Sequence, residues 1–323
     1  MSTESPVAQG HTRRARLFRV LGPNALPIAI LVLGVIFAVA QPAFLTADNL
    51  IGIVRQVVLI GIMASCTTFV IMTGGVDLSV GPVLAFGGLV AFFCLNAGWP
   101  LALVIFAGTT SGFAVGLISG AVIAFAGLPP IIVTLAALSI VRGAALTIGG
   151  TDQHLINSWP DYTFIGSGMI FGVPFSIFIF AVVALVMIFI QKRTPLGLLV
   201  AAIGDNERAA YLSGHRTRLT KMLVYGISGF GAALAGIIQT AQVHTAIAIY
   251  GPFGTELDVI AAVVLGGTSI MGGRGSVART LLGVFFLGIV NDGMNILNVS
   301  VDIQLIAKGI IIACALGLAA RGN

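Results

Sequence analysis

The chain has 323 residues, of which 58% are hydrophobic and 8% are charged, and its mean hydropathy is +1.08. Apolar stretches of membrane-spanning length therefore fill most of the sequence and leave little polar sequence for a separate soluble domain. The formal net charge of +5 is accounted for by the loops between the apolar stretches, so we expect no nucleic-acid partner. The composition predicts an all-α, polytopic membrane helical bundle.

Apolar windows predict about ten transmembrane helices within a permease-like membrane domain at residues 24–320. A tail at residues 1–23 precedes this domain, and residues 321–323 follow it. The first window could pass for a signal peptide, but no small-residue cleavage site follows before Gln41, so we expect it to be retained. The windows cover residues 24–40, 51–73, 79–97, 101–126, 130–149, 172–190, 221–242, 256–271, 279–297 and 303–320.

The distribution of basic residues predicts how the spans are oriented. If the N-terminus is cytoplasmic, every Lys and Arg lies in an inner loop or tail except Arg55, Arg142 and Lys308, which fall within spans or at their ends. This pattern agrees with the positive-inside rule. We therefore expect both termini and the loop at residues 191–220 to face the cytoplasm.

Residues 74–88 place one carboxylate among several glycines between two long apolar runs. Lipid cannot hydrogen-bond a loosened backbone, so this segment must be buried by protein or reached by water. Asp77 is either the N-cap of the third span, which Gly74 and Gly75 allow the chain to enter sharply, or a gate residue near a pore. Gly74, Gly75, Asp77 and Ser79 are the candidate pore or gate residues.

The loop at residues 191–220 is the largest polar inner loop, and it contains a predicted short helix. Asp205 or Asn206 can serve as the N-cap of this helix, and Gly214 can end it. The helix is too short to be stable alone, so it must pack on another surface.

Two interpretations of this short helix stay open. Ala209 and Leu212, three residues apart, form a small apolar patch flanked by Glu207 and Arg208. The helix either packs on its own loop or docks on another protein. The candidate docking residues are Gly204, Asp205, Asn206, Glu207, Arg208, Ala209, Ala210, Leu212, Ser213 and Gly214.

Glu256 and Asp258 begin the eighth apolar window, where negative charge is favourable at a helix N-terminus. The alternative is that they dock a soluble protein at the outer mouth. Lys308 lies deeper in the last window, and we expect Asp302 or Asp292 as its partner.

Four stretches in order resemble the permease subunit of ribose-type ABC sugar importers, within a wider group that includes branched-chain amino-acid permeases. The order and spacing of the four are more specific than any one of them, and together they extend over nearly the whole chain. They are residues 50–56 with Thr73-Gly-Gly-Val-Asp-Leu-Ser-Val-Gly81, residues 204–214, residues 224–236, and residues 256–275 with Gly-Gly-Arg-Gly at 272–275.

The resemblance implies a type II ABC importer-like fold in the bacterial inner membrane, and residues 204–214 resemble the coupling helix of that family. It also implies three protein partners: a cytoplasmic ATPase, a periplasmic substrate-binding protein and a second permease copy. No lysine is followed by Ser or Thr, so a P-loop is missing and a partner must hydrolyse ATP. The expected solute is a small, ribose-like sugar.

Two other classes of membrane protein are alternatives to an ABC permease. A self-contained secondary carrier usually keeps carboxylates well inside its spans, where only Asp292 and marginally Asp77 could lie. A membrane enzyme needs a convergent acid, base or metal cluster, but the histidines are scattered, so we expect no catalytic residue, metal or cofactor. An ABC permease for another small polar solute, such as a polyol or a branched-chain amino acid, also remains open.

Overall fold

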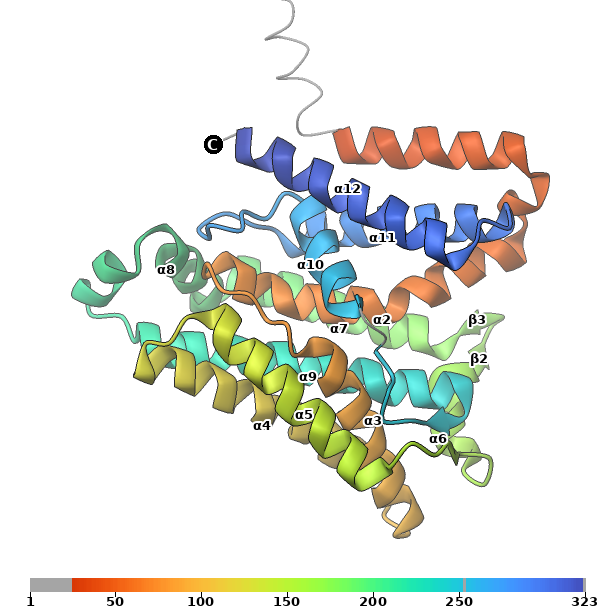
Figure 1. Cartoon of the computed structure of the whole chain (residues 1–323), viewed down its shortest axis with the longest axis horizontal. Helices are drawn as coiled ribbons and strands as arrows, with labels where there is room; N and C mark the ends of the chain where they lie inside the picture. The colour runs from red at the N-terminus through yellow and green to blue at the C-terminus, as the bar shows by residue number, and fades with distance from the viewer. Residues whose placement is uncertain (1–24, 252–253, 322–323) are drawn as a thin grey trace, which may run out of the picture.

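The computed structural model describes residues 25–251 and 254–321 and shows an all-helical bundle (Figure 1). The predicted N-terminal tail lies outside the described residues, as do the last two residues of the predicted C-terminus. The helices are Ala25–Ala40, α2 (Ala47–Met72), α3 (Val80–Asn96), α4 (Leu101–Ala126), α5 (Pro130–Gly149), α6 (Pro160–Ser167), α7 (Phe175–Arg193), α8 (Pro195–Leu212), α9 (Thr217–Val243), α10 (Thr255–Leu265), α11 (Val277–Ile296) and α12 (Val301–Arg321), with a 3₁₀ turn η1 at Pro42–Leu45.

The polytopic all-α architecture is confirmed, and a helix lies within each predicted apolar window. Six of the described helices, α2, α4, α5, α7, α9 and α11, are long and apolar enough to cross a membrane. The helix Ala25–Ala40 and α3 are shorter apolar helices, and α10 has 11 residues. The predicted number of about ten spans therefore stays a prediction.

Helix α9 lies at the centre of the bundle and packs against α2, α3, α4, α6 and α8 (Figure 1). Small residues allow its backbone to approach its neighbours closely. A Cβ on Gly116 of α4 would collide with the Tyr225 carbonyl of α9, and a Cβ on Gly87 of α3 would lie 2.7 Å from the Ala233 Cα. Association in lipid depends on such close packing, because apolar helices gain no hydrophobic burial there.

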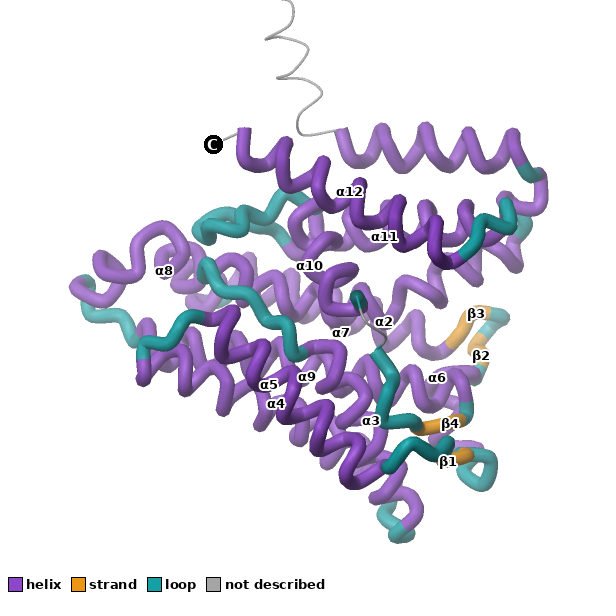
Figure 2. Tube along the Cα trace, viewed as in Figure 1, coloured by secondary structure: helices purple, strands orange, loops and turns teal. Residues whose placement is uncertain are grey.

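The connecting segments gather at the two ends of the bundle. Four short strands lie at one end, and α8 lies at the other (Figure 2). The strands form two antiparallel pairs, β1 (His154–Leu155) with β4 (Thr245–Ala246) and β2 (Met169–Ile170) with β3 (Val173–Pro174). At the α8 end, the Gly273 N–H donates to the Met72 carbonyl at 2.9 Å. These contacts join loops that the predicted topology places on the same side of the membrane.

Candidate functional site

The first interruption of the bundle is the non-helical segment at residues 73–79, between α2 and α3. Figure 1 shows this segment running from the α8 end toward the centre, where α3 begins. Most of its residues are buried, and Gly74 is its exposed exception. The sequence-based expectation that protein must cover this loosened backbone agrees with that burial.

Asp77 is the centre of a buried polar cluster and is 1% exposed. Its Oδ1 accepts hydrogen bonds from the Ser79 N–H at 2.9 Å and the Ser79 hydroxyl at 2.6 Å. Its Oδ2 accepts one from the Ser228 hydroxyl of α9 at 2.7 Å, and the Ser228 and Thr67 oxygens lie 3.1 Å apart. The carboxylate therefore joins the segment at residues 73–79 to α9, and through Ser228 to α2.

The expectation that Asp77 is the N-cap of the third span is wrong in detail. Helix α3 begins at Val80, and its N-cap is Ser79. Asp77 lies two residues earlier and accepts the Ser79 N–H, an Asx turn that fixes the chain just before the helix starts. Its second oxygen is used for a contact with α9, which no capping role requires.

The two glycines of this segment have different roles. Gly74 has φ +76°, a conformation that side chains with a Cβ rarely adopt. Gly75 has no positive φ, but a Cβ there would collide with the Tyr225 hydroxyl of α9. That hydroxyl is buried beside the backbone of Val76, in the same segment. The sharp turn thus depends on Gly74, and the close approach to α9 depends on Gly75.

The second interruption is the non-helical stretch between β4 and the short helix α10, of which the structure describes residues 247–251 and 254. Figure 1 shows it running from the strand end toward the centre, opposite in direction to the first interruption. Arg142 of α5 holds it through three backbone carbonyls. The guanidinium donates to Ala248 at 2.8 Å, to Tyr250 at 2.8 Å and to Gly251 at 2.9 Å. Arg142 is therefore an anchor for this segment, and its head group is engaged by protein.

The two interruptions meet where α3 and α10 begin. A Cβ on Gly81 would lie 2.8 Å from the Glu256 carboxylate, and one on Gly251 would lie 2.5 Å from the Gly81 carbonyl. The negative charge of Glu256 also acts on the Arg142 guanidinium. Glu256 thus lies, half-buried, beside the N-terminus of α3.

The structure corrects the expected partner of Lys308. Its ammonium pairs with the Asp258 carboxylate of α10 at 3.0 Å, and both side chains are 19% exposed. Asp292, one of the two expected partners, instead accepts a hydrogen bond from the Asn49 side chain at 2.8 Å. Sequence spacing suggested only carboxylates that are close to Lys308 along the chain. The packing of α12 on α10 instead brings Asp258 to Lys308.

The inner loop contains the expected short helix as the second half of α8. Asn206 has φ −160° and ψ 97°, so the helix is broken there, and its Oδ1 accepts the Ala209 N–H at 2.9 Å. Asn206 is therefore the N-cap of residues 207–212. Gly214, at φ +86°, lies just past the helix end. Sequence analysis did not predict the first half of α8, which begins at Pro195.

The second half of α8 presents a mixed surface outward. Ala209 and Leu212 are both exposed, whereas Ala210 is buried against the chain. The Glu207 carboxylate pairs with the Lys221 ammonium of α9, which ties the short helix to the start of the central helix. The apolar patch expected from sequence is thus open to a partner.

Gly204 connects the two halves of α8 to the first interruption. A Cβ on Gly204 would collide with the Met72 carbonyl and with the backbone nitrogen of Gly273. Met72 is the last residue of α2, directly before the segment at residues 73–79. The expected coupling segment therefore packs, through Gly204, against the residue that directly precedes the segment with the expected gate residues.

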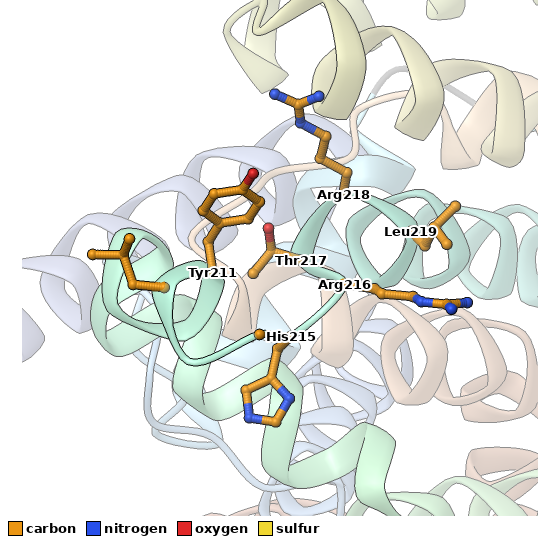
Figure 3. Close-up of a pocket in the computed structure, with 8 residues that line it drawn as sticks. Tyr211, His215, Arg216, Thr217, Arg218 and Leu219 are labelled. Atoms are coloured by element: carbon orange, nitrogen blue, oxygen red, sulfur yellow. The ribbon is translucent and has the colours of Figure 1, made fainter.

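The turn between α8 and α9 forms an open hollow of about 550 Å³. Figure 3 shows the side chains of Tyr211 and Arg218 on one side of this turn and that of His215 on the other. The polar groups do not converge, and no group of three or more potential metal ligands occurs in the part of the chain that the structure describes.

Several residues that position the candidate site were missed by sequence analysis. Arg142 was noted only as a basic residue within a span or at its end, although a lone Arg in an apolar span is itself a functional signal. Ser228 and Tyr225 carry no such signal, because small hydroxyl and aromatic residues are common in packed membrane helices. Only the fold brings them to Asp77.

Comparison with known proteins gives consistent results. The family model described as "Branched-chain amino acid transport system / permease component" matches residues 49–316. The ribose import permease protein RbsC of Haemophilus influenzae is 39% identical over 293 residues, which cover 89% of this chain and 90% of that protein. RbsC of Escherichia coli K12 is 37% identical, over 89% of this chain and 90% of that protein.

A relative named for a different solute is similar over a larger share of this chain. The L-arabinose ABC transporter permease protein AraH of Azospirillum brasilense is 33% identical over 97% of this chain and 93% of that protein. No solved structure matches the chain. The matches extend across both interruptions and the inner loop, so the chain belongs to the family of branched-chain amino acid transport system permease components, a transport component rather than an enzyme.

Proposed function

We propose that this chain is the membrane-spanning permease subunit of an ABC importer for a ribose-like monosaccharide, driven by a separate ATPase. The observation that carries the proposal is the full-length similarity to permeases whose printed solutes are ribose and L-arabinose. The broken helices, with backbone loosened inside the bundle, are the type of structure that transporters use at the level of their solute path.

The geometry supports a transport role for the first interruption. Gly74, Gly75, Asp77 and Ser79 form a segment that begins beside the inner loop and ends at the centre of the bundle. In the proposed role they form a gate whose position depends on the Asp77 contacts to α9. Glu256 and Asp258 lie in the first turn of α10, where the two interruptions meet. In the proposed role, docking of the binding protein acts on Glu256 through Arg142 and on Asp258 through Lys308.

The secondary-carrier alternative finds less support. Asp292, the carboxylate that a carrier would need deep in a span, lies near the end of α11 and is hydrogen-bonded to Asn49 near the start of α2. An importer for a polyol or a branched-chain amino acid stays a second candidate, because the family description names branched-chain amino acids. A panel of sugars, polyols and amino acids tested on the cognate binding protein separates these solutes.

The proposed assembly has two permease copies in the lipid of the bacterial inner membrane, with the ATPase inside and the binding protein outside. The membrane domain spans residues 24–320 with about ten spans, and residues 1–23, 191–220 and 321–323 face the cytoplasm. The basic residues of the inner loops support this orientation.

Cysteine labelling in sealed cells tests the orientation. In a variant without its native cysteines, a Cys placed at Ser213 should resist a membrane-impermeant reagent, whereas a Cys at Phe171, at the strand end, should react. Residue 171 is fully exposed and lies between β2 and β3. Ready labelling at position 213 in intact cells would overturn the orientation.

Docking of residues 204–214 on the ATPase is tested by Ala209→Arg. Ala209 is exposed on a small apolar patch, and a hydrated charge buried there at an interface is costly unless it is paired. We expect loss of ATPase copurification in detergent and of sugar-stimulated ATP hydrolysis, while the permease still folds. The matched control is Ala202→Arg, an exposed Ala in the first half of the same helix. Wild-type association of the Ala209→Arg permease would remove this helix from the coupling role.

A further inference from the structure

An exposed apolar side chain, that of Met271, lies at the α8 end of the bundle, outside residues 204–214. Met271, in the loop between α10 and α11, is 82% exposed. Ile270 before it is partly buried, whereas Ser269, Gly272 and Arg274 make the rest of the turn polar or glycine. A large apolar side chain this exposed on a polar connecting loop is not explained by packing within the described chain, and such side chains mark protein contacts when they adjoin other exposed apolar groups.

The backbone holds Met271 outward. The Ser269 N–H donates to the Arg274 carbonyl at 2.8 Å, and the Gly272 N–H donates to the Ser269 carbonyl at 3.1 Å. Gly272 and Gly273 have φ of +90° and +77°, which only glycine adopts readily. The turn at residues 269–274 is therefore closed by its own hydrogen bonds, so the backbone that carries Met271 needs little further ordering when a partner binds.

This turn is continuous with the proposed coupling helix. A Cβ on Gly272 would lie 2.9 Å from the Gly204 Cα, and the Asp205 carboxylate abuts Gly273. Leu212 and Tyr211, on the second half of α8, are 75% and 61% exposed at the same end of the molecule. The turn and the short helix thus form parts of one surface, which carries the exposed cations Arg208 and Arg274.

We propose that Met271 is a second docking contact for the ATPase, beside residues 204–214; this inference rests on the proposed function. The expected partner surface is an apolar recess with carboxylates at its rim, since Met271 supplies a flexible apolar knob and Arg208 and Arg274 supply positive charge. Methionine suits such a recess because its unbranched thioether adapts to an irregular pocket.

The position of the turn gives this contact a mechanical role. The turn leads directly from α10, and its Gly273 N–H donates to the Met72 carbonyl at 2.9 Å. Force applied at Met271 therefore reaches the second interruption through α10 and the first interruption through Met72. The short helix of α8 reaches the first interruption through the contact of Gly204 with Met72.

Photo-crosslinking in the complete complex tests the contact. A photoreactive amino acid at position 271 should crosslink to the ATPase subunit, and one at Phe171, which is exposed at the opposite end, should not. Crosslinks from position 271 only to lipid or to a second permease copy would overturn the proposal, as would the absence of a crosslink under conditions in which position 209 reacts with the ATPase.

Met271→Arg gives an independent measure in the same complex. We expect retention of the ATPase to fall by about tenfold, as for loss of one well-buried interface side chain, with Phe171→Arg as the matched control. If Ala209→Arg loses the ATPase and Met271→Arg retains it fully, this inference fails and the proposed function stands. If the wild-type permease itself binds no ATPase, the proposed function fails.

Discussion

The two interruptions of the bundle are anchored by side chains of opposite charge. At residues 73–79, the Asp77 carboxylate accepts from one backbone N–H and two hydroxyls. At residues 247–251, the Arg142 guanidinium donates to three backbone carbonyls. Extended backbone inside a membrane protein leaves both kinds of group without helical partners, and lipid supplies none. The negatively charged anchor therefore serves hydrogen-bond donors, and the positively charged anchor serves carbonyl acceptors.

Asp77 and Arg142 also differ in their position relative to the segment that each one anchors, and in their burial. Asp77 belongs to the interrupted segment itself and reaches out to α9, whereas Arg142 belongs to α5 and reaches across to a segment more than a hundred residues away. Asp77 is fully buried, and Arg142 is half-buried. The comparison predicts that loss of Asp77 has the larger effect on stability, because Asp77 itself lies farther from water than Arg142.

The largest effect is expected for Asp77→Ala. The change leaves the Ser79 N–H and the hydroxyls of Ser79 and Ser228 without their acceptor, and a buried unpaired donor costs about 1–3 kcal/mol. We expect a loss of about 3 kcal/mol in stability, because the serine hydroxyls can find other acceptors, together with a loss of transport. Thermal unfolding in detergent and sugar uptake measure the two.

Asp48→Ala is the control for Asp77, since Asp48 is an exposed carboxylate in the first turn of α2. It should cost no more than about 1 kcal/mol, the usual value of a charge at a helix N-terminus. Equal unfolding temperatures for the two variants would show that the Asp77 cluster does not stabilise the first interruption.

A smaller loss is expected for Arg142→Leu, because the Arg142 side chain is itself half-buried and water can enter the space that it leaves. We expect a loss of about 2 kcal/mol, within the range for hydrogen bonds from a charged donor. Arg142→Lys should restore only part of this, since an ammonium lacks the planar fork that reaches three carbonyls. Arg55→Leu, a half-buried Arg on α2 with no hydrogen bond in the described structure, is the control. A stable, active Arg142→Leu protein would refute the anchor.

Gly75→Val should have the smallest effect on stability and a clear effect on transport. The new side chain meets the Tyr225 hydroxyl and Val70, both side-chain atoms that can shift, so we expect about 1 kcal/mol, the low end of the usual cost of overpacking. Gly52→Val, on α2 in open space, provides the same substitution without a collision. Comparable uptake by both variants at equal membrane abundance would argue against a tight approach between residues 73–79 and α9.

Much of the fold could be predicted from the sequence because apolar length determines membrane helices directly. The windows at residues 101–126 and 130–149 coincide with α4 and α5 to the residue. Helix α6 and the strand pairs at the other end were not predicted, because they are short and their pairing depends on distant segments such as β1 with β4. The first half of α8 was missed because its apolar residues read as part of a loop.

The candidate site was predictable in its location and not in its contacts. The glycines around Asp77 and the capped pattern after Asn206 are local signals, and both mark real breaks in helices. The bonds from Ser228 to Asp77 and from Lys308 to Asp258 join residues 151 and 50 positions apart. Such pairs depend on helix packing, and sequence spacing carries no information about them.

ATP-driven uptake tests the central claim of a permease subunit powered by a separate ATPase. The measurement is radiolabelled ribose uptake into proteoliposomes that contain the permease, its ATPase and its binding protein, with each component and ATP omitted in turn. We predict uptake only when all three proteins and ATP are present, and loss of that uptake with Ala209→Arg. Full uptake by the permease alone, without ATPase or ATP, would contradict the account.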